Sequence, residues 1–165
     1  MIVCMASGIG TNFEVLVQNG IKIDLLVCNK KDAKVLDKAT RLSVQYIVSE
    51  DQYEKVVPNH TKLVILAGFM KILSKEFVKK YPTVNIHPSL LPSFKGKDAV
   101  SQALNAGVKL AGCTVHWVNE KIDSGKIIEQ ASCPVWEDDN EHTLHARIHE
   151  LEHKIYADAI KQIMR

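Results

Sequence analysis

Asn85 and His87 stand two residues apart at the end of an apolar segment, in the string Asn85-Ile86-His87-Pro88. Alternation along a strand puts both side chains on the same side of it. An amide can donate a hydrogen bond to a developing oxyanion, and an imidazole can move a proton near neutral pH. The pair therefore predicts carbonyl chemistry at a strand end, and a purely structural histidine is the alternative.

The N-terminal string Ser7-Gly8-Ile9-Gly10-Thr11-Asn12 joins an apolar segment to an amphipathic one. Glycines permit a tight turn, and the free N–H groups at the start of a helix favour an anion. Phe13 replaces the third glycine of a dinucleotide-binding loop, and the next predicted strand ends in Cys28-Asn29 without an acidic residue for a ribose. The loop therefore favours a nucleotide monophosphate over NAD, and a turn with a helix cap and no ligand is the alternative.

Two carboxylates could serve the same site. Asp123, in Asp123-Ser124-Gly125, could orient His87 and stabilise its protonated form, although the triplet alone favours an ordinary turn. Glu152 falls at the edge of the apolar face of the last amphipathic segment. There it could bind an amine or a hydroxyl at the rim of a pocket, and a solvated glutamate is the alternative.

The same segment carries a separate stripe of four histidines, His142, His145, His149 and His153. Because they form no His-Glu-x-x-His arrangement, the stripe favours an exposed or partner-facing flank over a metal site. The four cysteines, by contrast, each lie in an apolar stretch and form no Cys-x-x-Cys pair: Cys4, Cys28, Cys113 and Cys133. Buried, inert thiols are expected there.

The elements that must position these residues alternate between apolar runs and amphipathic segments. Strands are predicted over residues 2–6, 23–28, 44–48, 62–67, 83–86, 113–118 and 127–134. Helices are predicted over residues 12–18, 33–42, 51–57, 74–80, 98–105 and 141–164. This order is typical of an α/β protein with an open, mostly parallel twisted sheet of about seven strands and helices on both faces. Ligands bind such sheets at the loops that follow the strands, which is where the polar motifs occur.

Length and charge limit the class of function. The chain has 165 residues, 46% of them hydrophobic and 24% charged, which is typical of one globular domain over residues 1–165. A net charge of +2 provides no basic field for nucleic acid or an anionic membrane, so small-molecule partners are expected. The apolar run 63–70 is too short to span a bilayer, and we expect no leader before the first strand. We therefore expect a cytoplasmic protein, either a monomer or a homodimer.

Five strings together resemble the glycinamide ribonucleotide (phosphoribosylglycinamide) formyltransferases, a branch of the folate-dependent formyltransferase family. They are Ser7 to Asn12, Leu66 to Leu73, Asn85 to Pro92, Asp123-x-Gly125 and Glu152-His153-x-Ile155-Tyr156, in family order over almost the whole chain. The Asn-x-His-x-Ser-Leu-Leu-Pro string followed by a distant Asp-x-Gly is specific for formyl transfer. The N-terminal loop points to the ribonucleotide branch.

The resemblance implies a Rossmann-like fold and a one-carbon transferase of purine biosynthesis. Its co-substrate would be 10-formyltetrahydrofolate, its acceptor the primary amine of glycinamide ribonucleotide, and no metal would be required. It assigns catalysis to Asn85, His87 and Asp123. It assigns the acceptor's phosphate to Gly10, Thr11 and Asn12, and its glycinamide end to Glu152. Two walls around the folate ring are implied, one of Met70, Lys71, Ile72 and Leu73 and the other of Val118, Asn119, Glu120, Lys121 and Ile122.

Some segments depart from the family's pattern. Lys71 stands where many members carry Arg, and residues 94–97 lack a histidine-containing segment seen in some members. Residues 49–61 contain no counterpart of an arginine for the folate glutamate tail, and the chain ends directly after the last helix. We expect the fold and the chemistry to be retained and the affinity for folate to differ.

The sequence leaves other functions open as alternatives. One is a formyltransferase that acts on methionyl-tRNA or a nucleotide sugar, and another is a formyltetrahydrofolate hydrolase. The length of 165 residues predicts no additional tRNA-binding or regulatory domain. A non-catalytic nucleotide-binding regulator would use residues 8–12 but would not require Asn85, His87 and Asp123.

Overall fold

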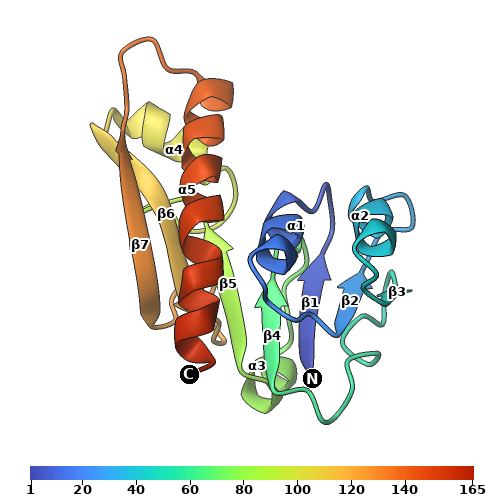
Figure 1. Cartoon of the computed structure of the whole chain (residues 1–165). Coiled ribbons are helices and arrows are strands. Elements are labelled where there is room, and N and C mark those ends of the chain that lie inside the picture. Colours follow the sequence, from blue (N-terminus) through green and yellow to red (C-terminus); the bar gives the residue numbers. More distant parts are fainter. The chain divides into compact units, whose positions relative to one another are not determined.

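A computed structural model of the chain describes all residues 1–165 (Figure 1). Two compact units make up the chain, Met1–Asn85 and Ile86–Arg165. Seven strands are hydrogen-bonded in the order β3-β2-β1-β4-β5-β6-β7, and β5 (Thr83–His87) belongs partly to each unit. The predicted α/β class, with a mostly parallel sheet of seven strands, is confirmed. The prediction of a single domain over residues 1–165 stays a prediction.

In the first unit, parallel strands flank β1 on both sides. β1 pairs with β2 and with β4, so that Cys4 lies opposite both Leu26 and Ile65. β2 pairs in turn with β3, and β4 with β5, both in parallel. The bounds are β1 Ile2–Ala6, β2 Leu25–Cys28, β3 Tyr46–Val48 and β4 Leu63–Leu66. β2 and β4 are buried along their whole length, which explains their unbroken Leu, Val and Ile runs.

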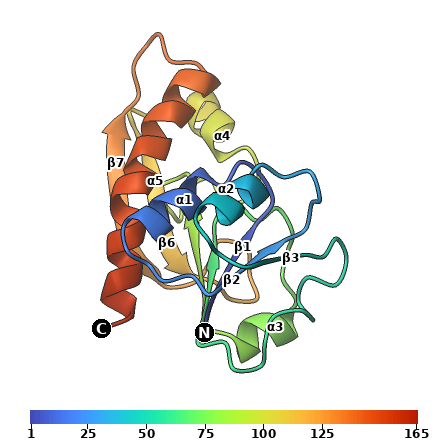
Figure 2. The same ribbon diagram turned by 45° about the vertical axis from the view of Figure 1, so that its right-hand side comes forward.

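Three helices belong to the first unit, α1 (Thr11–Gln18), α2 (Val35–Arg41) and α3 (Lys75–Lys80). α1 and α2 lie side by side (Figure 2), and Glu14 of α1 forms ion pairs with Lys38 and Arg41 of α2. Ser74 caps α3 by accepting a hydrogen bond from the Phe77 N–H at 3.1 Å. These contacts tie each helix to a defined place beside the strands.

In the second unit, β6 (Leu110–Trp117) and β7 (Ile127–Pro134) form an antiparallel pair. The helices are α4 (Ala99–Ala106) and the long α5 (Glu141–Ile163), which runs along β6 and β7 (Figures 1 and 2). α5 begins at a capping box, in which Asn140 and Thr143 each accept the other's backbone N–H at 3.0 Å. This cap satisfies donors that the first turn would otherwise leave unpaired.

The helix predicted over residues 51–57 is wrong, because these residues form turns. The bonds from Lys55 N to Gln52 O and from Val57 N to Glu54 O each close one turn and do not continue. The Glu54 carboxylate accepts two hydrogen bonds from Ser74, both at 2.6 Å. This tertiary contact outweighs the local helical pattern. The other predicted elements exist, with ends that differ by at most three residues.

All four cysteines are free and buried, as predicted. Burial raises the pKa of each thiol, and that of Cys113 reaches about 12. The thiols are therefore protonated and unreactive at neutral pH. None of the helices has the length and apolar character needed to cross a bilayer.

Candidate active site

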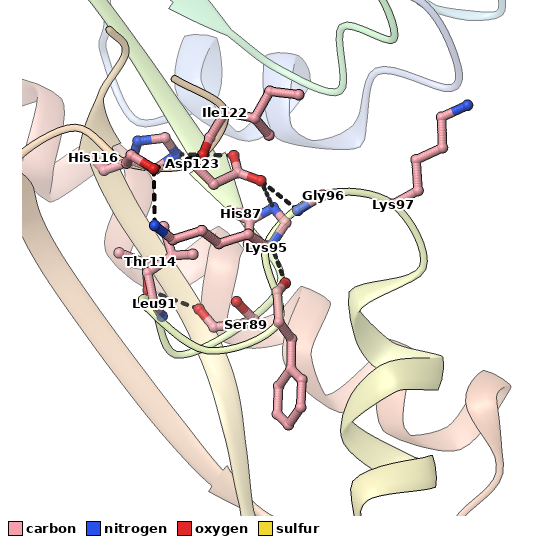
Figure 3. Close-up of polar contacts among 12 residues, drawn as sticks. His87, Ser89, Leu91, Lys95, Gly96, Lys97, Thr114, His116, Ile122 and Asp123 are labelled. Atoms are coloured by element: carbon pink, nitrogen blue, oxygen red, sulfur yellow. Dashed lines mark hydrogen bonds and ion pairs between the residues drawn. The ribbon is translucent and has the colours of Figure 1, made fainter. Parts of the chain in front are cut away.

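The imidazole of His87 is buried at the carboxyl end of β5, between two acceptors (Figure 3). Nε2 lies 2.8 Å from the Phe94 carbonyl oxygen, and Nδ1 lies 3.4 Å from Oδ2 of Asp123. Because a carbonyl oxygen only accepts, Nε2 carries a hydrogen and donates it. Nδ1 faces a carboxylate, which stabilises a second N–H on the ring. The two contacts therefore hold the imidazole in one orientation.

Asp123 lies between two imidazole rings and a backbone amide. Its Oδ2 accepts a hydrogen bond from the Gly96 N–H at 2.8 Å, and its Oδ1 lies 3.6 Å from Nε2 of His116. The side chain is 10% exposed, so water screens its charge little. Its backbone has φ 48°, a left-handed turn conformation that Asp tolerates well. Asp123 thus sits in the turn that its triplet favoured and also directs its carboxylate at His87.

His116, near the end of β6, is a residue of the site that the sequence reasoning missed. It is 2% exposed, and its Nδ1 donates to the Trp117 carbonyl at 3.0 Å. Burial lowers the pKa of His116, and it outweighs the opposing effects of the Trp117 carbonyl and the Asp123 carboxylate. His116 is therefore neutral at pH 7, and His87, at 3.4 Å, is the nearer of the two imidazole partners of Asp123. The available signal was the spacing Thr114-Val115-His116, which puts two polar side chains on one face of an apolar strand.

Thr114 anchors the loop that follows His87. Its hydroxyl donates to the Ser89 carbonyl at 2.7 Å and accepts from the Leu91 N–H at 3.0 Å. Gln130 of β7 donates to the same hydroxyl and to the Leu91 carbonyl, both at 3.0 Å. Paired backbone groups hold this loop in place in addition to the restraint that its prolines provide. These hydrogen bonds connect the segment after His87 to β6 and β7.

Gly125 allows the turn that carries Asp123 to lie against β6. A Cβ atom at this position would lie 1.6 Å from the Trp117 carbonyl oxygen, a distance that no side chain could adopt. Lys95 holds the turn from another side, because its Nζ donates to Ser124 Oγ at 2.8 Å. The glycine of the Asp-x-Gly triplet is thus a packing requirement that places the carboxylate.

The predicted anion loop opens α1 in the first unit. Gly10 is the residue before the helix and has φ 77°, and a Cβ there would lie 2.3 Å from Cγ2 of Val35. Thr11 and Asn12 follow at the end of α1 where N–H groups have no partner within the helix. A glycine is required for this close approach, and the helix start suits an anion.

A cavity of about 470 Å³ lies beside this loop. Its lining includes Gly8 and Asn29, together with the three lysines Lys30, Lys31 and Lys34. Asn29 accepts a hydrogen bond from the Ser7 hydroxyl at 2.5 Å. Asp32 and Glu50 also line the cavity, so its three lysines leave a small excess of positive charge beside the loop.

The two segments predicted as folate walls are loops with exposed apolar side chains. In the first unit, Met70 and Ile72 are 74% and 76% exposed, and the Met70 N–H donates to the Ser7 hydroxyl at 2.8 Å. In the second unit, residues 118–122 follow β6, and Ile122 is 55% exposed. Exposed apolar side chains of this kind suit the faces of a flat ring system. The contact with folate stays a prediction.

Glu152 lies at the centre of the buried stripe of α5, and its predicted position at the edge is wrong. The residues at spacings of four on either side are buried: Leu144, Ile148, Tyr156 and Ile160. Glu152 itself is 6% exposed, so the alternative of a solvated glutamate is also wrong. Its Oε2 accepts a hydrogen bond from Nδ1 of His149 at 2.9 Å. Sequence reasoning placed Glu152 at an edge because carboxylates are rarely buried unless they are paired, and the pairing with His149 was not foreseen.

Three histidines of the stripe on α5 pack against one another along the helix. The ring centroids of His145 and His149 are 5.7 Å apart, and those of His149 and His153 are 4.3 Å apart. His142 is exposed at the start of the helix. No group of three potential ligands in the chain is arranged to hold a metal ion. His149 is the member of the stripe that contacts Glu152.

The structure brings His87 and Asp123 together, with His116 as an additional partner. Asn85 is half-buried two residues before His87 on β5, where it lies opposite Leu66 of β4. Gly10, Thr11 and Asn12 are consecutive at the start of α1 in the first unit. The catalytic and binding roles assigned to these residues stay predictions.

Comparisons with known proteins agree on one family. The sequence model of the formyl transferase family matches residues 1–160. Phosphoribosylglycinamide formyltransferase of Bacillus subtilis (strain 168) is 39% identical over 179 residues, which cover 96% of this chain and 92% of that protein. The trifunctional purine biosynthetic protein adenosine-3 of Gallus gallus is 40% identical over 182 residues, which cover 98% of this chain and 18% of that protein. The crystal structure of phosphoribosylglycinamide formyltransferase from Anaplasma phagocytophilum matches with a TM-score of 0.92 and 39% identity, covering 98% of this chain and 85% of that one.

Proposed function

Since this chain belongs to the formyl transferase family, we propose that it transfers the formyl group of 10-formyltetrahydrofolate to the primary amine of glycinamide ribonucleotide. The products would be formylglycinamide ribonucleotide and tetrahydrofolate, in purine biosynthesis. The relatives named phosphoribosylglycinamide formyltransferase match 96% and 98% of this chain, which supports the proposal. The observation that carries the proposal is the buried pair of His87 and Asp123 at a strand end, with 3.4 Å between Nδ1 and Oδ2.

The reaction sets two demands on the protein. When bound, 10-formyltetrahydrofolate supplies a formyl carbon attached to N10, the nitrogen that leaves. The acceptor's nitrogen forms a bond to that carbon while the bond from carbon to N10 breaks. Negative charge grows on the formyl oxygen during attack, and one proton must pass from the amine to N10. The protein must therefore stabilise an oxyanion and move a proton.

His87 and Asn85 meet the first demand. A protonated His87 donates a charge-assisted hydrogen bond to the oxyanion, and the Asn85 amide is the second donor on the same side of β5. In the structure the Nε2–H of His87 is directed to the Phe94 carbonyl at 2.8 Å. An oxyanion is the stronger acceptor because it carries charge, so it would replace this carbonyl as the partner of the ring.

Asp123 meets the second demand. Its carboxylate offsets the positive charge of His87, and it can accept the surplus proton of the amine through water before that proton reaches N10. The neutral His116 beside it does not compete for this charge. The three residues proposed for catalysis are therefore Asn85, His87 and Asp123.

Binding is assigned to residues of both units. Gly10, Thr11 and Asn12 would hold the phosphate at the start of α1, and Glu152 would contact the glycinamide end. The exposed apolar side chains of Met70, Ile72 and Ile122 would cover the folate ring, as parts of the two wall segments. None of these steps requires a metal. The four free thiols suit a reducing compartment, so we place the enzyme in the cytoplasm.

The test is an assay with purified protein, both substrates and a metal chelator. We expect tetrahydrofolate and formylated ribonucleotide to form in equal amounts. His87→Ala should lower kcat by about 10³-fold, because it removes a charged donor and a proton carrier together. Calorimetric binding of the ribonucleotide, which depends on the phosphate loop, should change little.

His60→Ala is the matched control, because His60 is an exposed histidine on another loop. It should retain full activity. Absence of product from this substrate pair, alongside turnover of another formyl acceptor such as a nucleotide sugar, would overturn the assignment. Equal loss of turnover and ribonucleotide binding in His87→Ala would indicate misfolding.

A further inference from the structure

The Glu152 carboxylate lies in the apolar interior of the second unit, where an ionised group requires a partner. His149, one turn earlier on α5, supplies it through the 2.9 Å contact between Nδ1 and Oε2. The side chain of Glu152 is 7% exposed and that of His149 is 29% exposed. The imidazole thus lies between the buried carboxylate and solvent.

We propose that His149 is a positioning residue, and that its hydrogen bond to Oε2 fixes the orientation of the Glu152 carboxylate toward the acceptor. The inference rests on the proposed function, in which Glu152 contacts the glycinamide end of the ribonucleotide. His149 engages Oε2, so the contact with the acceptor would use Oε1. His149 itself would not touch either substrate.

Neighbouring rings restrict the orientation of the His149 ring. The His145 ring stacks on it at 5.7 Å and the His153 ring packs against it at 4.3 Å with a tilt of 59°, which limits its rotation. The spacing of three residues places His149 and Glu152 on adjacent positions of the helix surface. The orientation of the donor is therefore set before any ligand binds.

Charge favours the contact between His149 and Glu152. The hydrogen bond to Glu152 raises the pKa of His149, so its ring carries positive charge more often near neutral pH. From β6, the thiol of Cys113 faces the pair, and the Glu152 charge contributes to the raised pKa of that thiol. β7 also carries the titratable residues Glu129 and Cys133, and α4 carries none.

Removal of the imidazole should act on binding and not on chemistry. Without this donor, Oε2 loses the contact that fixes it, and the Glu152 carboxylate can shift or rotate from its position. Either change weakens the contact with the acceptor. The pair of His87 and Asp123 is formed by other elements, so the rate at saturating substrate should be retained.

Comparing His149→Ala with His149→Asn distinguishes a role in orienting Glu152 from a role in the stability of the fold. The Nδ2 of Asn stands as many bonds from the backbone as the Nδ1 of His, so Asn restores a donor to Oε2. We expect His149→Ala to raise the KM and Kd for glycinamide ribonucleotide by about tenfold, which corresponds to ~1.4 kcal/mol. The kcat and the KM for folate should stay within twofold, and His149→Asn should recover most of the lost affinity. His142→Ala, an exposed histidine of the same stripe, should behave as the wild type.

Calorimetric binding of the ribonucleotide without folate distinguishes the two proposals. A wild-type enzyme that binds the ribonucleotide but forms no product contradicts the proposed function and leaves the role of His149 open to measurement. A His149→Ala variant that binds it as tightly as the wild type overturns that role. A loss of kcat and melting temperature in both His149 variants, without recovery by Asn, would show that His149 supports the fold instead.

Discussion

Replacing Asp123 by Asn separates the charge of this side chain from its shape. The amide retains an oxygen that can accept the Gly96 N–H, now 2.8 Å from Oδ2, so the turn should stay folded. It removes a negative charge that lies 3.4 Å from Nδ1 of His87. The protonated form of His87, which the proposed mechanism uses to stabilise the oxyanion, then loses its counter-charge.

Coulomb's law sets the size of this effect. Two unit charges 3.4 Å apart interact by ~5 kcal/mol at an effective dielectric constant of about 20 and by ~1 kcal/mol in bulk water. The Asp123 side chain is 10% exposed, so the interaction lies between these limits. A loss of ~3 kcal/mol corresponds to a decrease in kcat of roughly 10²-fold. The KM values should change little, because Asp123 is not assigned to substrate binding.

The assay is steady-state formation of tetrahydrofolate with both substrates saturating, together with thermal melting of each variant. Asp98→Asn is the matched control, because it neutralises an exposed acid in the loop before α4. It should keep the wild-type kcat. If folded Asp123→Asn protein retained kcat within threefold of the wild type, Asp123 would not act on the charge of His87, and the reasoning would be refuted.

Three further predictions concern stability and reactivity. Gly10→Ala should lower the free energy of unfolding by about 2 kcal/mol, because φ is 77° and Cβ would meet Val35 at 2.3 Å. An unchanged unfolding midpoint in denaturant would contradict this clash. The Arg147 guanidinium holds the pKa of Asp139 well below its usual range, so this carboxyl stabilises the fold above about pH 4 and loses that contribution as the pH falls. Asp139→Asn should therefore flatten the decrease of melting temperature below about pH 4, and an unaltered slope would exclude the effect. Native Cys113, with a pKa of about 12, should not react with a thiol reagent at pH 8 and should react after unfolding.

Much of the fold could be predicted because its signals are local. The strands β2 and β4 are buried along their length, so their sequences are continuous runs of apolar residues. The helix predicted over residues 51–57 is wrong because the Glu54 carboxylate accepts hydrogen bonds from Ser74. The local sequence pattern does not encode this contact, which spans twenty residues. Sequence reasoning missed His116 for the same reason. Its place in the site depends on the turn that brings the Asp123 carboxylate to 3.6 Å from its ring.

The sequence by itself determined which groups could do chemistry. It placed Asn85 and His87 on one side of a strand, and it put glycine where the loop at Gly10 requires a positive φ. Tertiary structure alone decided that Asp123 pairs with His87 and that Glu152 is buried against His149. The physical reason is that strand alternation and backbone φ are set within a few residues, whereas charge pairing and burial depend on which distant segments pack together.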